Sequence, residues 1–334
     1  MKPLVSILLP VWNAATTLAA CLRSIQRQTT SCWQCIIVDD GSDDGSLACA
    51  HRFAAADARF VVVSIPHRGV VTALNTGLDY CHGPLIARMD ADDLMHRKRL
   101  AVQVQALNNT PQLVAIGCHV RLFPRRHLRQ GRLAYERWLG SIDSAQRVCQ
   151  DAFVECPIAH PTLMIRRQVL LALGYRDRGW PEDYDLILRL LSQGSAVGVV
   201  PRRLLSWRDH PQRLSRVDPR YALASFTACK AAFLAAHFLA DSETYILWGY
   251  GSTGKALRRA LLPYAKRPSY IVELHPGRLG KRIHHALVIA PEALTQTPRH
   301  PVVVSVAGLQ ARTEIRQSMA AMGFVEGRDF VCAA

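Results

Sequence analysis

Asp90 and Asp92 form the acidic pair whose spacing points most directly to chemistry. One residue separates them, and they follow an apolar run that is typical of a strand. Two carboxylates at a strand end offer oxygen ligands to a hard divalent cation, Mg²⁺ or Mn²⁺, which would neutralise charge on a departing phosphate group. We assign the neighbouring Asp93 instead to capping a helix that is expected to begin near Leu94.

A second acidic pair, Glu182 and Asp183, directly follows Pro181. One carboxylate of such a pair can act as a general base and take the proton of an acceptor hydroxyl. The same three residues are also typical of a helix start, where proline and acidic side chains are favoured. Both interpretations can hold at once.

A glycine-rich motif near the C-terminal end has the spacing G-x-G-x-x-G, formed by Gly249, Gly251 and Gly254. It lies between a predicted strand and a predicted helix, and Glu273 ends the next strand, where an acid that binds ribose would lie. The pattern predicts a site for NAD or another nucleotide, or a structural turn without a ligand. A P-loop ATPase is not expected, because Ala256 stands where that loop needs Ser or Thr.

The elements that must position these residues alternate between strands and helices. We expect strands at residues 5–10, 35–38, 60–65 and 84–89, and helices at 15–28, 45–56 and 70–80. This order predicts an α/β fold in which a mostly parallel central sheet has helices on both faces. Polar clusters follow three of the strands, at residues 10–13, 39–42 and 90–93. We expect them to meet at the carboxyl edge of the sheet.

The rest of the chain is expected to form a second domain and its connection. Strands at residues 161–166 and 197–200 flank a helix at 182–191, and the arginine-rich segment 121–137 is expected to be a loop. We predict a first domain over residues 1–218, a linker helix over 219–243 and a second domain over 244–334. The second domain is expected to be a small βαβ unit.

The composition of the chain is that of a globular protein. A chain of 334 residues with 49% hydrophobic and 20% charged residues favours two globular domains and excludes a disordered or coiled-coil chain. The net charge of +15 predicts an acidic partner. Arginines gather in two runs, Arg121, Arg125, Arg126, Arg129, Arg132 and Arg202, Arg203, Arg208, Arg213, Arg216. Because these runs lack interleaved aromatic residues, an anionic lipid surface suits them better than nucleic acid, and a simple solvated basic face stays equally open.

Cysteine usage and hydropathy predict a cytoplasmic protein. The ten cysteines are scattered and no cleavage site follows Met1, so we expect reduced thiols, with Cys32 and Cys35 structural and not redox-active or metal-binding. Residues 221–240 are alanine-rich but contain Lys230 and His237. A lysine at the centre of a membrane helix is unfavourable by about 2.5–3.5 kcal/mol, so this segment is expected to be a packing helix.

Six segments together resemble family 2 glycosyltransferases of the GT-A fold, which transfer a sugar from a nucleotide diphosphate. The matching segments are residues 6–13, 37–44, 86–93, 160–162, 182–186 and 208–210. The resemblance implies that the predicted domain 1–218 is a GT-A catalytic domain. Residues 244–334 resemble the Rossmann-like domains that are appended to some sugar-modifying enzymes.

The resemblance also implies roles in binding the nucleobase. Pro10, Trp12 and Asn13 would line the base pocket, and Trp12 stands where the family usually has tyrosine. Either Asp39 or Asp40 would accept a hydrogen bond from the base, which fits the imide N–H of uracil or thymine.

Further roles concern the phosphates and the metal. Arg68 would reach a donor phosphate, Asp90 the ribose or the metal, and Asp92 the metal itself. His210, in a loop that folds over the diphosphate in the family, would contact phosphate or metal. His160 is a weaker candidate for the acceptor side.

For the reaction itself, the resemblance implies an inverting displacement in which Asp183 is the base and Glu182 positions it or holds the acceptor. The donor would be a nucleotide-diphosphate sugar, with UDP favoured, and the acceptor a glycan or a lipid-linked glycan in cell-surface polysaccharide synthesis. Peripheral contact with an anionic membrane would follow. Two alternatives stay open: a catalytically silent protein that binds sugar nucleotides, and a bifunctional enzyme whose C-terminal domain binds NAD.

Overall fold

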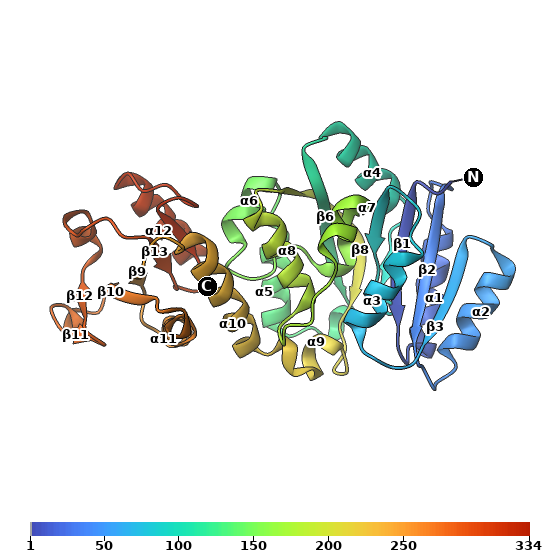
Figure 1. Cartoon of the computed structure of the whole chain (residues 1–334), viewed down its shortest axis with the longest axis horizontal. Coiled ribbons are helices and arrows are strands. Elements are labelled where there is room, and N and C mark those ends of the chain that lie inside the picture. The colour runs from blue at the N-terminus through green and yellow to red at the C-terminus, as the bar shows by residue number, and fades with distance from the viewer. Residues whose placement is uncertain (1) are drawn as a thin grey trace. The chain divides into compact units, whose positions relative to one another are not determined.

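The computed structural model describes residues 2–334, which divide into two compact units (Figure 1). One unit contains the residues up to Val148 together with Ile158–Arg178 and Arg189–Arg213. The other contains Cys149–Pro157, Gly179–Leu188 and Leu214–Ala334. The second unit thus includes two short segments from the middle of the chain, and the predicted domain boundaries at residues 218 and 244 stay a prediction.

The first unit is built on an eight-stranded sheet with the order β3-β2-β1-β4-β7-β6-β8-β5. The strands are β1 (Val5–Val11), β2 (Trp33–Asp40), β3 (Phe60–Ile65), β4 (Leu85–Arg88), β5 (Leu94–Met95), β6 (Leu113–Phe123), β7 (Met164–Arg166) and β8 (Ala196–Arg208). Strands β1 to β4 pair in parallel, as their uninterrupted apolar sequences predict. The β4–β7, β6–β7 and β5–β8 pairs are antiparallel, so the sheet is mixed.

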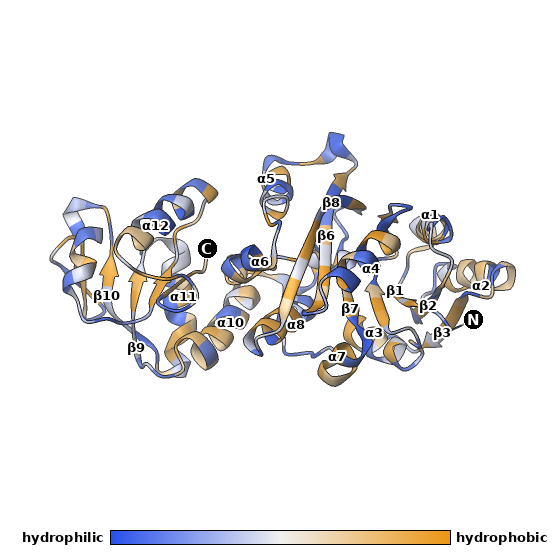
Figure 2. Ribbon diagram, turned by 90° about the horizontal axis from the view of Figure 1, so that it is seen from above, coloured by the Kyte–Doolittle hydropathy of each residue, from blue (hydrophilic) through white to orange (hydrophobic). Residues whose placement is uncertain are grey.

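Helices cover this sheet where the apolar periodicity of the sequence places them. They are α1 (Ala15–Gln26), α2 (Ser46–Ala56), α3 (Val70–Asp79), α4 (Arg99–Asn109), α5 (Gln130–Leu139) and α7 (Arg167–Leu173), while α6 (Ala145–Asp151) and α8 (Glu182–Ser192) each contribute residues to both units. Helix α3 packs on β1 and β2, on the side opposite α1 and α2 (Figure 1). The strands are mostly hydrophobic in Figure 2, in agreement with their buried side chains.

Two expectations for this unit are wrong. The segment 121–137 is not a loop, because β6 continues to Phe123 and α5 begins at Gln130. No helix begins near Leu94 either, since Leu94 and Met95 form β5 and the helix starts at Arg99. In both places pairing with β8 decides the structure, and pairing between distant strands leaves little local signal.

The second unit contains a six-stranded sheet with the order β11-β12-β10-β9-β13-β14, larger than the small βαβ unit that we expected. Its strands are β9 (Thr244–Trp248), β10 (Arg267–Val272), β11 (Arg282–Ile283), β12 (Ala286–Ile289), β13 (Val302–Val304) and β14 (Phe330–Cys332). Only β11 pairs antiparallel. The five parallel strands have the order 3-2-1-4-5, in which the sequence order reverses at β9, the strand before the glycine motif.

Helices of the second unit include α9 (Leu214–Val217), α10 (Leu223–Phe233), α11 (Ser252–Leu261) and α12 (Leu309–Ala321). Buried apolar side chains form clusters on both faces of its sheet. Lys230 on α10 donates hydrogen bonds from Nζ to the carbonyls of Val154 (2.6 Å) and Ala333 (3.1 Å). Among the described residues no helix has the length and apolarity to cross a bilayer. All ten cysteines are free thiols.

Candidate active site

The loops after β1 and β2 are held together by hydrogen bonds around Asn13. The backbone N–H of Asn13 donates to Ser42 Oγ (3.0 Å), and Asn13 Oδ1 accepts from the N–H of Asp43 (3.0 Å). Asn13 adopts φ = 49°, a left-handed conformation that asparagine tolerates better than most residues. Asn13 therefore holds together the loops after β1 and β2, and Pro10 and Trp12 lie at this same edge of the sheet.

The structure distinguishes the two aspartates that end β2. Asp40 is fully engaged: its Oδ1 accepts from the N–H of Arg68 (2.8 Å), and its Oδ2 accepts from the N–H of Gly69 (2.8 Å) and lies 2.9 Å from His67 Nδ1. It thereby orders the turn that leads into α3. Within residues 2–334, Asp39 accepts a hydrogen bond only from the N–H of Ser42, through Oδ2 (3.2 Å).

The second carboxylate oxygen of Asp39 has an unusual environment. Its Oδ1 is buried and has no hydrogen-bond partner among the residues that the structure describes. A buried acceptor without a partner is costly, by about 1–3 kcal/mol, and therefore rare in native proteins. Of the two candidates, Asp39 is the one with an acceptor left for a ligand.

Trp12 lies at the same edge, with 53% of its surface exposed. Its ring stacks on His67, with centroids 4.6 Å apart and planes inclined by 20°. Sequence reasoning missed His67, whose only local signal is its position next to Arg68. The Arg68 side chain is exposed, and the structure shows only its backbone engaged in the turn.

Three carboxylates converge beyond β4. One ligand oxygen from each of Asp90, Asp92 and Asp93 lies within 4.8 Å of the others. Burial and then the charge of Asp90 raise the pKa of Asp92, and burial raises the pKa of Asp93 well above its usual value. A hard divalent cation would relieve this repulsion, and carboxylate oxygens are the ligands that such cations prefer. The residues present therefore fit a divalent cation.

Each of these carboxylates has a different protein partner. Asp90 forms an ion pair with Arg88, and Asp92 Oδ2 lies 3.1 Å from His210 Nε2. Asp93 Oδ1 accepts a hydrogen bond from the backbone N–H of Arg208 (2.7 Å). The expected role of Asp93 as a helix cap is thus wrong: it fastens the end of β8 to the carboxylate cluster.

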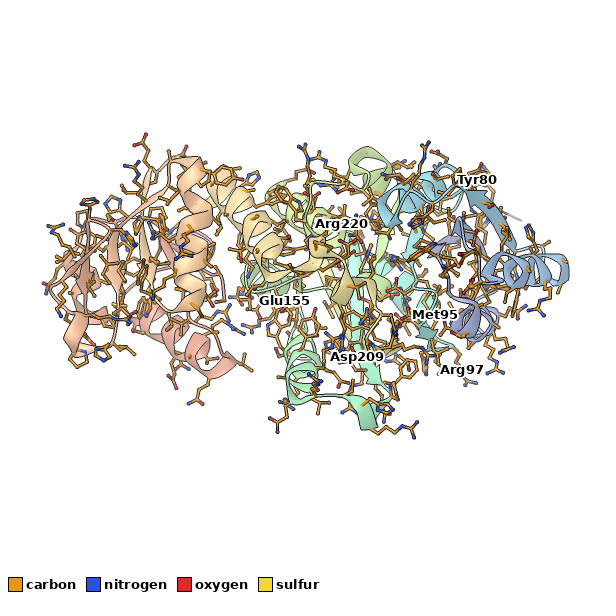
Figure 3. All side chains as sticks on the ribbon, turned by 90° about the horizontal axis from the view of Figure 1, so that it is seen from below. Tyr80, Met95, Arg97, Glu155, Asp209 and Arg220 are labelled. Atoms are coloured by element: carbon orange, nitrogen blue, oxygen red, sulfur yellow. The ribbon has the colours of Figure 1, made fainter. Side chains whose placement is uncertain are left out.

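The segment that carries His210 is held by side chains that sequence reasoning missed. Arg208 Nε donates to the carbonyl of Asp92 (2.7 Å). Asp209, labelled in Figure 3, forms an ion pair with Nε of Arg132 from α5 (3.2 Å). Arg213 lies over the ring of Trp207, with its guanidinium carbon 4.5 Å from the centroid. The contacts of Arg208 and Asp209 connect residues more than 70 positions apart, which no local pattern reveals.

The acidic pair Glu182 and Asp183 opens α8, in a segment that belongs to the second unit. Glu182 is 2% exposed, and its Oε2 accepts a hydrogen bond from the hydroxyl of Tyr221 (2.6 Å). Burial and then the charge of Glu182 raise the pKa of Tyr221, so this hydroxyl stays protonated. Asp183 is half-buried, and its Oδ1 accepts from the N–H of Tyr184 (2.7 Å). Sequence reasoning missed Tyr221.

His160, a weaker candidate for the acceptor side, is a buried residue. Its Nε2 lies 3.1 Å from the hydroxyl of Tyr175. Burial and then the nearby charge of Arg88 lower the pKa of His160 well below its usual value, so the ring is neutral. These contacts describe a packed residue of the core.

The glycine motif of the second unit gives each glycine a different environment. Gly249 adopts φ = 93°, and a Cβ at Gly254 would lie 2.3 Å from the carbonyl oxygen of Gly249. A Cβ at Gly251 would meet no atom within 4 Å. Glu273 Oε1 accepts from the N–H of Tyr250 (2.8 Å) and pairs with Arg278 Nη1 (3.1 Å). The turn and the close helix contact of a dinucleotide motif are thus present, while one oxygen of the acid is already used.

Comparison with known proteins extends this description. Residues 6–174 match the model of glycosyl transferase family 2, just over half of the chain. EpsE of Bacillus subtilis (strain 168) is 28% identical over 278 residues, which are 80% of this chain and 93% of EpsE. The amylovoran biosynthesis glycosyltransferase AmsE of Erwinia amylovora is 30% identical over 207 residues, 61% of this chain and 75% of AmsE.

Solved structures show the same fold at low sequence identity. S. aureus TarS 1-349, crystallised with UDP-GlcNAc, has a TM-score of 0.58 and 14% identity, with 79% of this chain and 72% of TarS covered. The mannosyltransferase PcManGT of Pyrobaculum calidifontis, solved with GDP-Man and Mn²⁺, has a TM-score of 0.52 and 20% identity, with 79% and 73% covered. The chain is a glycosyltransferase with the GT-A fold, and it belongs to glycosyl transferase family 2.

Proposed function

We propose that the protein transfers a sugar from a UDP-sugar, with release of UDP, to a glycan or a lipid-linked glycan, with inversion and with a divalent metal, in the synthesis of a cell-surface polysaccharide. The observation that carries the proposal is the convergence of Asp90, Asp92 and Asp93, with His210 against Asp92. The amylovoran biosynthesis role of AmsE and the UDP and GDP-Man complexes of the structural neighbours support the polymer and the donor class.

The donor base would lie at the edge formed by Pro10, Trp12 and Asn13. The unpartnered Oδ1 of Asp39 is an acceptor for the imide N–H of uracil, which supports UDP. The exposed indole of Trp12 offers a stacking surface, worth about 1–3 kcal/mol per base at comparable sites. Arg68 carries a positive charge at the start of α3, where a donor phosphate would be stabilised.

The metal would be Mg²⁺ or Mn²⁺, held by Asp92 together with Asp90 or Asp93, and it would neutralise the departing diphosphate. His210 keeps the Asp92 carboxylate oriented through the 3.1 Å contact of its Nε2 with Oδ2, which supports a role for His210 beside the metal or the diphosphate. The Arg88–Asp90 ion pair orients the Asp90 carboxylate, and it leaves the ribose as a second role for that group.

The base would be Asp183, which removes the proton of the acceptor hydroxyl. A base needs an accessible carboxylate, and Asp183 is half-buried while Glu182 is buried and accepts the hydroxyl hydrogen bond of Tyr221. Glu182 and Tyr221 then position the start of α8. Because no protein acid is needed on the leaving side, a single carboxylate suffices for an inverting displacement.

A second candidate function concerns the C-terminal glycine motif. We propose a nucleotide or nucleotide-sugar ligand there, with NAD as one form to test. The open space at Gly251 supports it, since a ligand phosphate can approach that backbone closely. Glu273, which already holds Tyr250 and Arg278, argues for weak binding or for a structural turn.

We also propose a cytoplasmic location with peripheral contact to an anionic membrane. The net charge of +15 supports this, and each basic side chain near such a surface contributes about 1 kcal/mol. A lipid-linked acceptor would reach the enzyme from that surface.

Calorimetric titration of UDP with and without Mn²⁺, on the wild type and on Asp92→Ala, tests the proposed donor site. We expect binding that needs Mn²⁺ and that the substitution abolishes. GDP and dTDP are titrated in parallel, because tighter GDP binding would reassign the donor. If UDP, GDP and dTDP all fail to bind, the proposal is contradicted.

The C-terminal motif is tested in the Asp92→Ala protein, in which the first site is disabled. Titration of NAD and of UDP, repeated after the further change Gly251→Ala, reports binding at this motif alone. Binding that Gly251→Ala removes supports a ligand site, and the absence of binding identifies a structural turn.

A further inference from the structure

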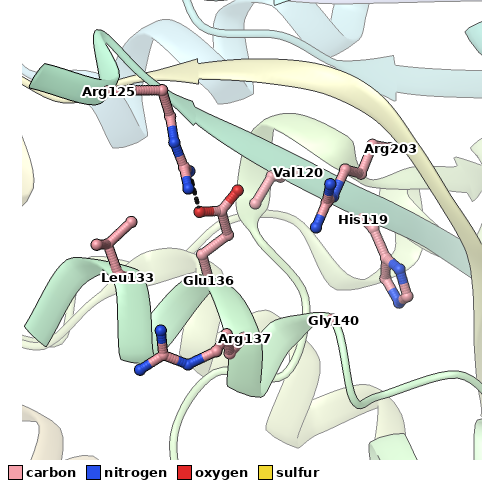
Figure 4. Close-up of a pocket in the computed structure, with 8 residues that line it drawn as sticks. All are labelled: His119, Val120, Arg125, Leu133, Glu136, Arg137, Gly140 and Arg203. Atoms are coloured by element: carbon pink, nitrogen blue, oxygen red, sulfur yellow. Dashed lines mark hydrogen bonds and ion pairs between the residues drawn. The ribbon is translucent and has the colours of Figure 1, made fainter. Parts of the chain in front are cut away.

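A polar pocket lies between α5 and the strands β6 and β8. It has a volume of about 380 Å³. Figure 4 shows its eight lining residues: His119, Val120, Arg125, Leu133, Glu136, Arg137, Gly140 and Arg203. No role assigned above uses this pocket.

One face of α5 and its C-cap residue Gly140 supply half of the lining. Leu133, Glu136, Arg137 and Gly140 are spaced by three and four residues, so they share one side of the helix. Opposite them, His119 of β6 and Arg203 of β8 are direct partners in the parallel ladder and point to the same side of the sheet (Figure 4). The pocket is therefore built mainly by β6, β8 and α5, while Arg125 comes from the 3-10 turn at Arg125–His127.

An irregularity in β8 brings Arg203 to this side. Cys118 pairs with Val200 and His119 pairs with Arg203, so Pro201 and Arg202 are inserted between the two partners. Such bulges redirect side chains, and they occur often beside functional sites. His119 is oriented as well, because its Nε2 donates to the carbonyl of Ile142 (2.8 Å).

The charges of the pocket favour an anion. Glu136 is the only acid in the lining, and it is occupied: Oε2 pairs with Arg125 and Oε1 accepts from the N–H of Leu122 (3.3 Å). Arg137 and Arg203 have no ion-pair partner within residues 2–334. The formal charges of the three arginines and one glutamate in the lining sum to +2.

The chemistry of the lining excludes other ligand classes. No Phe, Tyr or Trp lines the pocket, so a sugar ring has no large stacking surface, and the guanidinium groups of Arg137 and Arg203 repel a cation. The guanidinium fork matches the oxygens of phosphate, and a phosphate dianion balances the charge of the lining.

We propose that this pocket binds a phosphate group of a phosphorylated ligand, either the acceptor or a lipid head group. The assignment of the phosphate to the acceptor rests on the proposed transferase function, whereas binding of phosphate by the pocket does not. Helix α5 connects the pocket to the carboxylate cluster, because its Arg132 pairs with Asp209, the neighbour of His210. Such a phosphate can arrive on an acceptor molecule or on a lipid head group, and both carry the same ligand chemistry.

Calorimetric titration of inorganic pyrophosphate in EDTA tests the pocket, since chelation prevents metal-bridged binding at the carboxylate cluster. The variants are Arg203→Gln, Arg137→Gln and, as a matched control, Arg202→Gln, which removes the same charge from the neighbouring exposed residue outside the pocket. We expect Kd to rise at least about fivefold in each pocket variant and to change less than about twofold in the control.

Titration of UDP with Mn²⁺ on the same proteins separates the two proposals. Unchanged UDP binding shows that the variants are folded and that the donor site is independent. If UDP fails to bind the wild type, the donor proposal fails while the pyrophosphate result still decides the pocket. No pyrophosphate binding by the wild type, or an equal loss in the Arg202→Gln control, overturns the pocket.

Cosedimentation with phosphatidylcholine vesicles that contain phosphatidylglycerol distinguishes the sources of the phosphate. Weaker vesicle binding by Arg203→Gln than by Arg202→Gln, with competition by pyrophosphate, identifies a lipid head group in the pocket. Equal vesicle binding by the wild type and Arg203→Gln, together with the loss of pyrophosphate affinity, assigns the pocket to an acceptor phosphate. Equal weakening by Arg202→Gln and Arg203→Gln indicates a diffuse basic surface and contradicts the proposal.

Discussion

Two edges of the molecule are built alike: a first edge beyond β1, β2 and β4, and a second edge beyond β9 and β10. They differ in whether the acidic side chains there have hydrogen-bond and ion-pair partners. Both follow the carboxyl ends of adjacent parallel strands. At the first edge Asp39 keeps an unpartnered buried oxygen, and burial raises the pKa of Asp92. At the second edge Glu273 is bound by a backbone N–H and by Arg278.

This difference makes the first edge the stronger candidate for a ligand site, because its acids lack the hydrogen bonds that Glu273 already has at the second. Unpartnered acceptors and crowded carboxylates cost stability, and they persist where a ligand compensates them. A carboxylate that already has its hydrogen bonds carries no such signal. The glycine spacing of the second edge is by itself weaker evidence for a ligand than the electrostatics of the first.

The largest effect is expected at the acidic pair of α8, which shows whether the second unit takes part in the reaction. Asp183→Asn should lower the release of UDP from a UDP-sugar by about 10²–10⁴-fold, because a general base contributes that much. UDP binding should not change. Glu182→Gln is the matched comparison, and its rate of UDP release should fall less than that of Asp183→Asn. A larger fall in Glu182→Gln would identify Glu182 as the base.

The two edges are compared directly by removing one acid from each. Asp92→Asn should lower UDP release by roughly 10²-fold or more, because the developing charge on the diphosphate loses its electrostatic stabilisation. Addition of EDTA to the wild type should have a similar effect. Glu273→Gln should change the rate less than about twofold, and a comparable loss there would remove the distinction between the edges.

Within the first edge, Asp39 and Asp40 should separate binding from stability. Asp39→Asn should weaken UDP binding by about tenfold, since the amide presents a donor or a poorer acceptor to the base. Asp40→Asn should chiefly lower the free energy of unfolding, because Asp40 orders the turn before α3 through Arg68 and Gly69. Calorimetry and urea denaturation on both variants check the assignment, and the reverse pattern would exchange the two roles.

Within the second edge, two glycines should respond differently. Gly254→Ala should destabilise the protein by about 1–3 kcal/mol, because its Cβ would lie 2.3 Å from a backbone oxygen. Gly251→Ala should change stability by less than about 0.5 kcal/mol, since φ is −75° and no atom is near. Urea denaturation measures both, and an equal loss would contradict the arrangement of the turn.

The smallest effect concerns the metal-free stability of the first edge. The pKa of Asp92 is higher in the folded state than in the unfolded state. Between these two pKa values the folded protein therefore binds more protons than the unfolded protein. The free energy of unfolding then falls as pH rises from the lower pKa to the higher one. Asp92→Asn should therefore raise Tm in EDTA at pH 7, and the gain should vanish below about pH 4. A lower Tm at pH 7 would show that the carboxylate is stabilised by its neighbours.

The sequence alone determined the strands, helices and polar edge of the first half, because buried parallel strands and their helices have strong local periodicity. It also identified the family, since segments such as Asp90–Asp93 keep their order and spacing. It did not predict the full length of β6, which pairs with β8, a strand about 80 residues away, nor the helix α5 that follows.

Only the tertiary structure decided how neighbouring acids divide their roles. Asp39 and Asp40 are the same residue type and adjacent in the chain. Asp40 accepts hydrogen bonds from the turn before α3, whereas Asp39 keeps a buried oxygen without a hydrogen-bond partner among the described residues. Asp93 likewise accepts a hydrogen bond from the backbone N–H of Arg208, and Glu182 accepts one from the hydroxyl of Tyr221. The physical reason is that the free energy of a carboxylate depends on its burial and on the donors around it, and the fold brings those donors from distant parts of the chain.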